Sequence, residues 1–411
     1  MPMTTLPDKP KLRRVEAFPV SDDARGPLYV IRDPCGLAPG LITLSPVAMF
    51  ILSLMDGEHG LLDIQEIFAR HTLQILPRQQ LEDMVRQLDE AHFLDSPAFE
   101  AYFNSLVEAY RAAPARISGS EESFGAPPGQ MGTVIQKMLF DGQDMPARSN
   151  RRLLGLVAPH LDYPRGAPAY SRAYRMLAAT QPPRRVIILG TNHFGQASSA
   201  VATRKDFQTP LGTTGTDRAF IEALENKLGT SLCEHEFDHQ REHSVELQLL
   251  ILQHLLRPEQ FEIVPVLCPD VCGPTGTAPY DGKGVDLRDL GEAIGELIRA
   301  DRTPTLIVAG ADLSHVGGQF GDERDLDAAF LQEVEQKDRE ALDALINQGC
   351  EAFVSVLKSR ENDTRVCSAG CIYAMMTALR GARPELLTYH QAASPQAGNG
   401  VTCAAIAVWE K

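Results

Sequence analysis

Histidine and acidic side chains close three apolar runs of strand length in the C-terminal part of the chain. One run ends at His160, a second ends at His193, and a third ends with Asp312 and His315. In an open sheet of parallel strands, ligands collect beyond the carboxyl ends of the strands. We therefore expect these four side chains to share one rim of a sheet. Imidazole binds zinc, copper and iron well, so this rim is a candidate metal site.

Each of these histidines, taken alone, also fits an ordinary loop residue whose hydrogen bonds are satisfied. Three strands that end in the same way favour a shared site, in which neighbouring carboxylates would orient the imidazole rings. These strand ends contain no H-E-x-x-H motif. The pattern therefore does not identify the metal.

A second polar cluster opens a predicted helix in the segment EHSVELQL, with Glu242 and His243 at its start and Glu246 one turn on. The start of a helix offers free N–H groups and the positive end of the helix dipole, which favours a structural role for Glu246. For Glu242 and His243, a role in the site and a role in capping the helix are equally open. We keep His243 as a candidate catalytic residue, together with Asp312 and His315.

Cys367 lies in the segment TRVCSAGCIYAMMTAL, where we expect a helix to begin near Ser368. A thiol at a helix N-terminus has a lowered pKa and becomes a better metal ligand or nucleophile. Cys371, one turn later, is predicted to belong to the core. Structural roles are predicted for the remaining cysteines, Cys35, Cys233, Cys268, Cys272, Cys350 and Cys403. The absence of a C-x-x-C pair argues against a structural zinc module.

Strand and helix patterns alternate through the C-terminal part. Strands are predicted at 153–160, 184–193, 261–269, 303–315 and 401–409, and helices at 169–180, 216–228, 243–256, 287–300 and 323–347. The strand runs are almost continuously apolar, as in strands that are covered on both faces. The pattern predicts an α/β fold with a mostly parallel central sheet flanked by helices.

The N-terminal part differs in pattern. A short strand is predicted at 26–33 and helices at 44–56, 61–71 and 78–95, followed by a segment rich in Gly, Ser and Pro at 115–132. We divide the chain into a small, mainly helical module at 1–114, a linker or crossing segment at 115–150, and an α/β domain at 151–411.

The composition restricts the function classes. A formal net charge of −15 argues against nucleic acid as a partner, because phosphate binding needs a basic face. No stretch reaches the ~20 apolar residues of a membrane span, and the segment MPMTTLPDKPKLRR lacks the apolar region of a secretory signal. We expect a cytoplasmic protein that does not bind membranes.

Residues from about 150 to 411 resemble the MEMO family, whose bacterial members are called AmmeMemoRadiSam system protein B. The resemblance rests on six motifs in order, APHLDYPRG, LGTNHFG, DFQTPLG, EHSVELQL, GADLSHVGGQFG and RVCSAG. It implies a fold similar to that of class III extradiol dioxygenases, which are nonhaem iron enzymes that open aromatic rings. It also implies a pocket of two histidines and a cysteine, here His160, His193 and Cys367, associated with iron or copper.

The resemblance places other residues beside this pocket. Asp312 and His315 match the D-x-x-H pair of the family, and His243 and Glu246 match its helix. The chain departs from the usual C-G-R-x-P, because Ser-Ala-Gly-Cys follows Cys367. A thiolate in place of the carboxylate ligand of the dioxygenases also changes the metal chemistry, so ring cleavage does not follow from the fold. Zinc is equally compatible with the spacing.

The N-terminal segments MDGEHGLLDIQEIFARH and LEDMVRQLDEAHFLD resemble a PqqD-type winged-helix module, which implies binding of peptides by strand addition. Such a module could also dock onto the C-terminal domain.

Three functions are left in competition. The first is a metal-dependent redox enzyme that acts with a radical-SAM protein partner. The second is a non-catalytic accessory protein of that system, which binds a metal, a peptide or a small-molecule ligand. The third is a hydrolase with Cys367 as nucleophile and His160 or His193 as base.

Overall fold

The computed structural model describes residues 6–22, 26–119, 124–141 and 146–411, and the chain forms two compact units. The first unit is Met1–Ala113 and the second is Pro114–Lys411. Each unit has a hydrophobic core of its own. The candidate site residues all belong to the second unit.

The first unit combines a three-stranded antiparallel sheet, in the order β1-β2-β3, with four helices. Its elements are β1 (Glu16–Asp22), β2 (Gly26–Arg32), β3 (Ile42–Leu44), α1 (Pro46–Ser53), α2 (Leu61–Thr72), α3 (Arg78–Glu90) and α4 (Pro97–Ala112). The helix predicted at 78–95 is confirmed over Arg78–Glu90, with Leu81, Val85 and Leu88 buried. The sequence pattern indicated β2 but missed β1 and β3.

The second unit is built on an eight-stranded sheet in the order β12-β14-β5-β11-β6-β10-β7, with β13 also paired to β14. The strands are β5 (Leu153–Ala158), β6 (Arg185–Thr191), β7 (Val201–Ala202), β10 (Glu262–Cys268), β11 (Thr305–Gly310), β12 (Asp312–Val316), β13 (Arg383–Ser394) and β14 (Asn399–Trp409). A smaller sheet has the order β4-β8-β9 and consists of β4 (Ala115–Ile117), β8 (Asp206–Thr209) and β9 (Gly212–Thr214).

The large sheet is mixed, which corrects the prediction of a mostly parallel sheet. Its four central strands, β5, β11, β6 and β10, are parallel to one another. The flanking strands β14 and β7 run antiparallel to β5 and β10, respectively. β13 and β14 form a long antiparallel pair joined by a short turn at Pro395–Ala397, a connection that only antiparallel strands permit.

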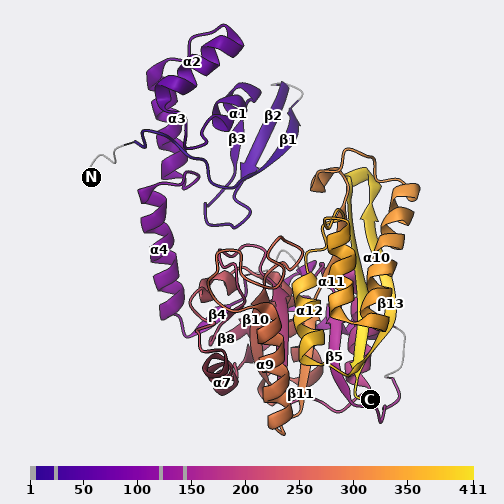
Figure 1. Cartoon of the computed structure of the whole chain (residues 1–411). Coiled ribbons are helices and arrows are strands. Elements are labelled where there is room, and N and C mark those ends of the chain that lie inside the picture. The colour runs from indigo at the N-terminus through magenta and orange to yellow at the C-terminus, as the bar shows by residue number, and fades with distance from the viewer. Residues whose placement is uncertain (1–5, 23–25, 120–123, 142–145) are drawn as a thin grey trace. The chain divides into compact units, whose positions relative to one another are not determined.

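Helices cover both faces of this sheet, and Figure 1 shows those of one face in front of the strands. The helices are α5 (Met131–Phe140), α6 (Tyr163–Ala178), α7 (Arg218–Leu228), α8 (His243–Leu256), α9 (Leu287–Ala300), α10 (Ala328–Gln348), α11 (Cys350–Ser359) and α12 (Ala369–Ala378). Side chains of α5, α6 and α8 share one core with Leu156 and Ile188 of the sheet. Side chains of α7, α9, α11 and α12 share the other core with the alternate residues Val157 and Ile187. This alternation is expected when both faces of a strand are buried.

The segment 115–150 belongs to the second unit in the structure. Its strand β4 pairs in parallel with β8, and α5 packs against α6 and α8. Arg116 of β4 is 1% exposed and Phe124 is fully buried. These burials anchor the segment that the sequence pattern marked as a linker or crossing segment.

Two predicted boundaries are corrected by the structure. The run 303–315 is not one strand, because the sheet position changes between β11 and β12, and β12 pairs with β14. At the turn, the Ala311 amide donates to the carbonyl of Ala158 (2.7 Å). The predicted helix 323–347 begins only at Ala328, where the side chain of Asp327 accepts from the amide of Phe330 and caps the first turn.

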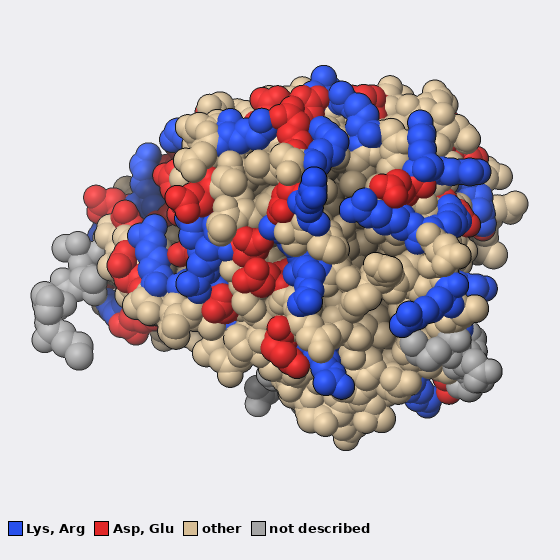
Figure 2. All heavy atoms as spheres, turned by 90° about the horizontal axis from the view of Figure 1, so that it is seen from below, with Lys and Arg blue, Asp and Glu red and all other residues tan. Residues whose placement is uncertain are grey.

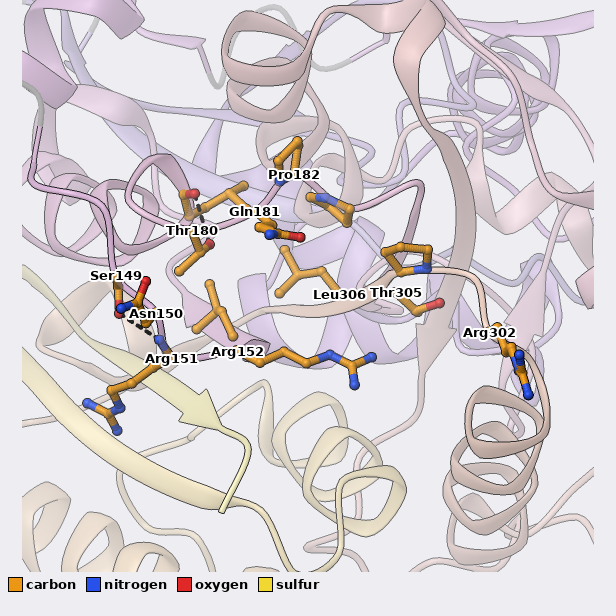
Figure 3. A pocket seen from close by; sticks show the side chains of 14 residues that line it. Ser149, Asn150, Arg151, Arg152, Thr180, Gln181, Pro182, Arg302, Thr305 and Leu306 are labelled. Carbon is orange, nitrogen blue, oxygen red and sulfur yellow. Dashed lines mark hydrogen bonds between the residues drawn. The ribbon is translucent and has the colours of Figure 1, made fainter.

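Among the described residues, no helix combines the length and the apolar character that crossing a membrane requires. Figure 2 shows basic and acidic side chains close together over much of the face it displays. A pocket of about 530 Å³ is lined by residues such as Arg152, Leu153 and Thr305 (Figure 3). These residues lie at the amino ends of β5 and β11 or just before them, whereas the candidate site lies beyond the carboxyl ends.

Candidate metal site

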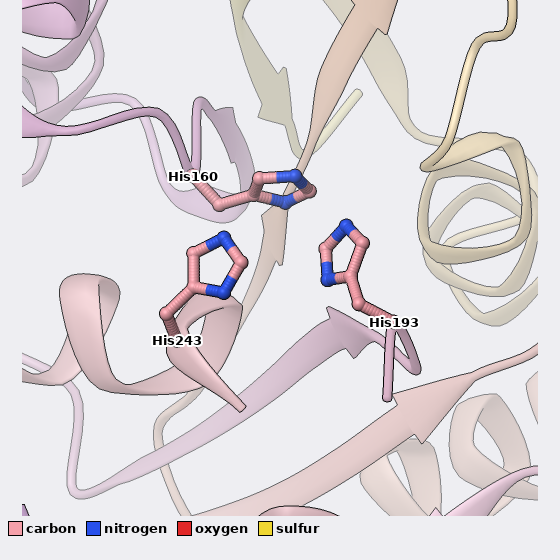
Figure 4. A group of neighbouring side chains, drawn as sticks. All are labelled: His160, His193 and His243. Carbon is pink, nitrogen blue, oxygen red and sulfur yellow. The ribbon is translucent and has the colours of Figure 1, made fainter. Parts of the chain in front are cut away.

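Three imidazole rings converge beyond the carboxyl ends of the central strands. His160 follows β5, His193 follows β6, and His243 is the first residue of α8. Figure 4 shows the rings facing one another. One ring nitrogen from each lies within 4.8 Å of the corresponding nitrogens of the others. The group could therefore hold a metal ion.

Two glycines allow α8 to approach the strand ends this closely. A Cβ atom on Gly190 of β6 would lie 2.5 Å from Oγ of Ser244, and one on Gly310 of β11 would lie 2.6 Å from the carbonyl oxygen of Ser244. Both distances are shorter than a carbon–oxygen contact allows, so any side chain there would push α8 outward. The two glycines thus let His243 reach the rings of His160 and His193.

His160 is almost fully buried and is fixed on both sides. Its Nδ1 lies 3.0 Å from the carbonyl oxygen of Gly310, and its amide donates to Oδ1 of Asp312 (3.0 Å). Since Nδ1 must carry the proton to donate to a carbonyl, Nε2 is left as the ligating nitrogen. Burial lowers the pKa of His160, but the charges of Asp312 and Cys367 outweigh burial and raise the pKa to about 9.

His193 is oriented by Glu242. Its Nδ1 lies 3.1 Å from each carboxylate oxygen of Glu242, and its amide donates to the same carboxylate. Burial lowers the pKa of His193, but the charge of Glu242 and the hydrogen bonds that His193 makes to Cys367 and Glu242 raise it well above the usual value. A histidine whose Nδ1 is held by a carboxylate presents Nε2 for coordination, which is the usual arrangement around metal-ligating histidines.

Glu242 also begins the helix, because its side chain accepts from the amide of Ser244 (2.8 Å) at the N-cap of α8. Burial raises the pKa of Glu242, but the neighbouring His193 and His243 hold it well below the usual range. The carboxylate of Glu242 therefore combines the two roles that the sequence left open, because it caps α8 and also holds the imidazole of His193.

His243 packs against the other two rings, with centroid separations of 5.0 Å from His193 and 5.3 Å from His160. Its Nδ1 is 3.4 Å from Oε1 of Glu242. Burial lowers the pKa of His243 to about 3, a shift that Glu242 opposes and the other two imidazoles reinforce. His243 is therefore neutral at physiological pH, as a metal ligand must be.

Cys367 adds a sulfur atom to the group. Its Sγ lies 3.5 Å from Nε2 of His160 and 3.1 Å from Oγ of Ser368. Burial raises the pKa of the Cys367 thiol, but His160 and His315 outweigh burial and lower the pKa well below its usual value. The helix expected near Ser368 begins at Ala369, so Cys367 stands just before the N-cap of α12.

Asp312 lies beside His160, with Oδ2 3.5 Å from Nε2 of that ring. Burial raises the pKa of Asp312, and the charge of His160 opposes this shift. Its amide donates to Oγ of Ser368 (3.2 Å), which also accepts from Oγ1 of Thr191 (3.0 Å). Ser368 thus links the thiol of Cys367 to two strand ends.

His315 lies at the edge of the group. Its Nδ1 is 3.1 Å from the carbonyl oxygen of Leu313 and 3.2 Å from that of Arg365, and its ring packs edge-on against Phe320 at 5.2 Å. These contacts hold the ring of His315 outside the group formed by His160, His193 and His243.

The strands that lead to His160 and His193, β5 and β6, lie on either side of β11. Sγ of Cys367 and Oδ2 of Asp312 each lie 3.5 Å from Nε2 of His160. His243 joins the imidazole group directly, whereas the family resemblance had set it beside the pocket. Glu246 is buried and ion-paired with Arg116. Sequence reasoning missed Ser368 and Thr191 as supports, although Ser368 lies within the motif RVCSAG and Thr191 within LGTNHFG. Cys371 is buried in the core, as predicted.

The fold and the site define an α/β protein whose central strands carry a histidine group that could hold a metal. The family model for Memo-like proteins matches residues 128–406. The chain belongs to the Memo-like protein family.

Curated relatives carry the same family name. A MEMO1 family protein of Aquifex aeolicus is 26% identical over 363 residues, covering 87% of each chain. One of Thermus thermophilus is 28% identical over 326 residues, covering 79% of this chain and 91% of the relative. The similarity to the Aquifex protein covers more residues than the second unit contains, so it extends into the first unit.

Proposed function

We propose that His160, His193 and Cys367, with His243 beside them, hold one iron or copper ion and that the protein is a metal-dependent redox enzyme. The observation that carries this proposal is the anchoring of Nδ1 in both His160 and His193, which directs the Nε2 atoms to one place beside a thiolate. The donor set fits a transition metal, because imidazole and thiolate suit copper, iron and zinc better than magnesium or calcium.

The bound metal would supply one-electron chemistry and a Lewis-acid centre. The side chains of the chain itself would hold and move protons near it. Asp312 is buried with a raised pKa and lies within 3.5 Å of His160, so it is placed to hold a proton. His315 and His243 are the other candidate acid–base groups, although the pKa of His243, lowered to about 3, makes its imidazole a weak base at neutral pH.

Redox chemistry is tested by loading the metal-free chain with Fe²⁺, Cu⁺ or Zn²⁺ in separate samples. We expect the iron or copper form to be oxidised and reduced reversibly, as followed by electron paramagnetic resonance with ferricyanide and ascorbate. Zinc has no redox chemistry of its own. A chain that retains only zinc, or an iron or copper form that cannot be cycled, would refute the redox function and leave metal binding intact.

Cysteine-dependent hydrolysis is the second candidate, and the 3.5 Å contact between Cys367 and His160 favours it. A thiolate paired with an imidazolium is a nucleophile that needs no metal. The two functions respond oppositely to chelation. A burst of nitrophenol released from p-nitrophenyl acetate by the metal-free chain, and lost in Cys367→Ala, would favour hydrolysis. Protection of Cys367 from iodoacetamide by bound metal would instead favour the metal site.

The accessory function is favoured by the first unit. Strand β1 pairs with β2 on one side, and its other edge has no strand partner among the described residues. An open edge is where a peptide adds as a further strand, as in the PqqD-type modules that this unit resembles. An accessory role beside a radical-SAM protein predicts a metal that binds but does not cycle, so the redox experiment above separates it from the enzyme.

A further inference from the structure

A buried arginine outside the histidine group holds the loop that leads into α8. Arg116 of β4 is 1% exposed. Its Nε donates to the carbonyl oxygen of His239 (3.0 Å), and its Nη2 donates to that of Glu242 (3.0 Å). Its Nη1 is ion-paired with the carboxylate of Glu246. One side chain therefore ties together both ends of the stretch 239–246.

The residues next to Arg116 reinforce this attachment. The hydroxyl of Ser118 and the amide of Gly119 both donate to the carboxylate of Glu246. The amide of Ser118 also donates to the carbonyl oxygen of Gln208 (2.8 Å), which continues the pairing of β4 with β8. We name residues 115–119 the arginine arm.

The loop held by the arginine arm carries two groups of the histidine site. Glu242 accepts from Arg116 with its carbonyl oxygen and holds His193 with its carboxylate. His243 is the next residue, and its ring joins the group shown in Figure 4. A shift of the loop would therefore move both His193 and His243 away from His160.

We propose that Arg116 is a positioning residue of the metal site and that the arginine arm belongs to this site, although it lies outside the residues that the family model matches, 128–406. The proposal rests on the metal-binding function proposed above. The arm begins three residues after α4 of the first unit ends at Ala112. It is therefore the covalent route by which the first unit can act on the metal site.

Lysine cannot replace arginine in this role. A planar guanidinium donates to two carbonyls and a carboxylate at fixed angles, whereas a lysine ammonium is a point charge on a flexible stem. Arg116→Lys keeps the charge opposite Glu246 and loses the fixed hold on the two carbonyls. Arg116→Met removes both and keeps the volume of the stem.

Arg185 provides a matched control. It is also buried, and it pairs with Asp217 (2.6 Å) and Asp301 (2.7 Å). It is the first residue of β6, at the opposite end of that strand from His193. Arg185→Met therefore breaks a comparable buried ion pair in the same unit without touching the loop before α8.

The experiment measures the affinity of the full chain for Zn²⁺ by competition with a chelator, together with thermal unfolding of the metal-free protein. We expect Arg116→Met to weaken zinc binding roughly 10–100-fold, the usual effect of losing an outer support of a metal site, and Arg116→Lys to have a smaller effect. Arg185→Met should unfold at a lower temperature and bind zinc as wild type does. Equal affinity in wild type and Arg116→Met, or equal weakening in Arg185→Met, would overturn the proposal.

The imidazole nitrogen shifts of the metal-free protein, measured by nuclear magnetic resonance, give a readout that does not depend on metal. In wild type and Arg185→Met, His193 should carry a proton on Nδ1, held by Glu242. In Arg116→Met, or in Arg116→Lys where the methionine variant does not fold, we expect the His193 signals to shift or double. Unchanged His193 signals would refute the positioning role. A wild-type chain that binds none of Zn²⁺, Fe²⁺ and Cu⁺ would instead refute the proposed function, and the His193 signals would still decide the role of Arg116.

Discussion

The Nδ1 nitrogen of His193 lies 3.1 Å from both carboxylate oxygens of Glu242, and the same carboxylate caps α8 through the amide of Ser244. One buried acid thereby fixes the orientation of an imidazole that follows a strand and the start of the helix that carries His243. The carboxylate of Glu242 therefore fixes His193, which follows β6, and His243, which begins α8, relative to each other. The geometry of the histidine group thus depends on Glu242, which is itself 1% exposed and is not one of the proposed metal ligands.

Replacing Glu242 should therefore damage the site without removing a ligand. We expect Glu242→Gln to weaken metal binding roughly 10–100-fold, because the amide holds the Nδ1 proton of His193 less strongly than the carboxylate does. Affinity for Zn²⁺ is the measurement. Glu236→Gln is the control, since Glu236 accepts from the Thr203 hydroxyl (2.8 Å) outside the histidine group. Equal affinities in the two variants would remove Glu242 from the support of the site.

The two cysteines of the RVCSAGC segment should behave differently. Cys367 lies 3.5 Å from Nε2 of His160, whereas Cys371 is buried one turn later in the core. We expect Cys367→Ser to lose most of its metal on dialysis, because the hydroxyl is a poor replacement for a thiolate donor. Cys371→Ser should retain its metal. The metal bound per chain is measured in both, and equal retention would show that the sulfur of Cys367 is not a ligand.

Metal affinity should rise with pH. The pKa of His160 is raised to about 9, so its imidazole carries a second proton at neutral pH that a metal must displace, and the pKa of His193 is raised in the same direction. Affinity for Zn²⁺ should therefore increase as the pH rises from about 6.5 towards about 9 and level off above the pKa of His160. In Cys367→Ser, the thiolate charge that helps raise the pKa of His160 is lost, so the rise should occur at lower pH. An affinity that does not change with pH over this range would contradict the proposed protonation states.

Gly310 should not tolerate a side chain. The Cβ of alanine would lie 2.6 Å from the carbonyl oxygen of Ser244 and 3.0 Å from Nε2 of Gln248, so α8 would have to move. We expect Gly310→Ala to destabilise the protein by roughly 1–3 kcal/mol, as overpacking usually does, and to weaken metal binding. Gly318→Ala is the control, because its Cβ meets no atom within 4 Å. Thermal unfolding and zinc affinity are compared. A Gly310→Ala variant as stable as Gly318→Ala would refute the close-packing argument.

The strands that carry the site could be predicted because both of their faces are buried. β5, β6 and β10 are nearly continuous apolar runs, and the residues that follow them mark the rim. β13 was not predicted, because its residues are mostly half-buried and its apolar and polar side chains do not alternate regularly. The break between β11 and β12 at Ala311 was also missed, since a single residue separates the two strands and the residues on both sides of it are buried. Continuous burial does not reveal where a strand changes its partner.

Site residues that follow a strand could be predicted from the sequence, whereas residues that packing brings into the site could not. His160 and His193 were found from their positions at strand ends. The entry of His243 into the same group depends on the close approach that Gly190 and Gly310 permit, which no local pattern encodes. Arg116 was missed for a similar reason. It lies in a segment whose composition is typical of a linker, and its partner Glu246 is 130 residues away.

The most direct test of the metal site is elemental analysis of the full chain, expressed and purified without chelator and without nickel affinity resin. We predict about one ion of iron or copper per chain, and about one ion of zinc when the other metals are withheld, in keeping with a single site of nitrogen and sulfur donors. The variant His160→Gln should carry almost none, and His254→Gln, at an exposed position bonded to Gln136, should match wild type. A wild-type chain that holds no metal after incubation with Fe²⁺, Cu⁺ or Zn²⁺ and dialysis would contradict the central claim.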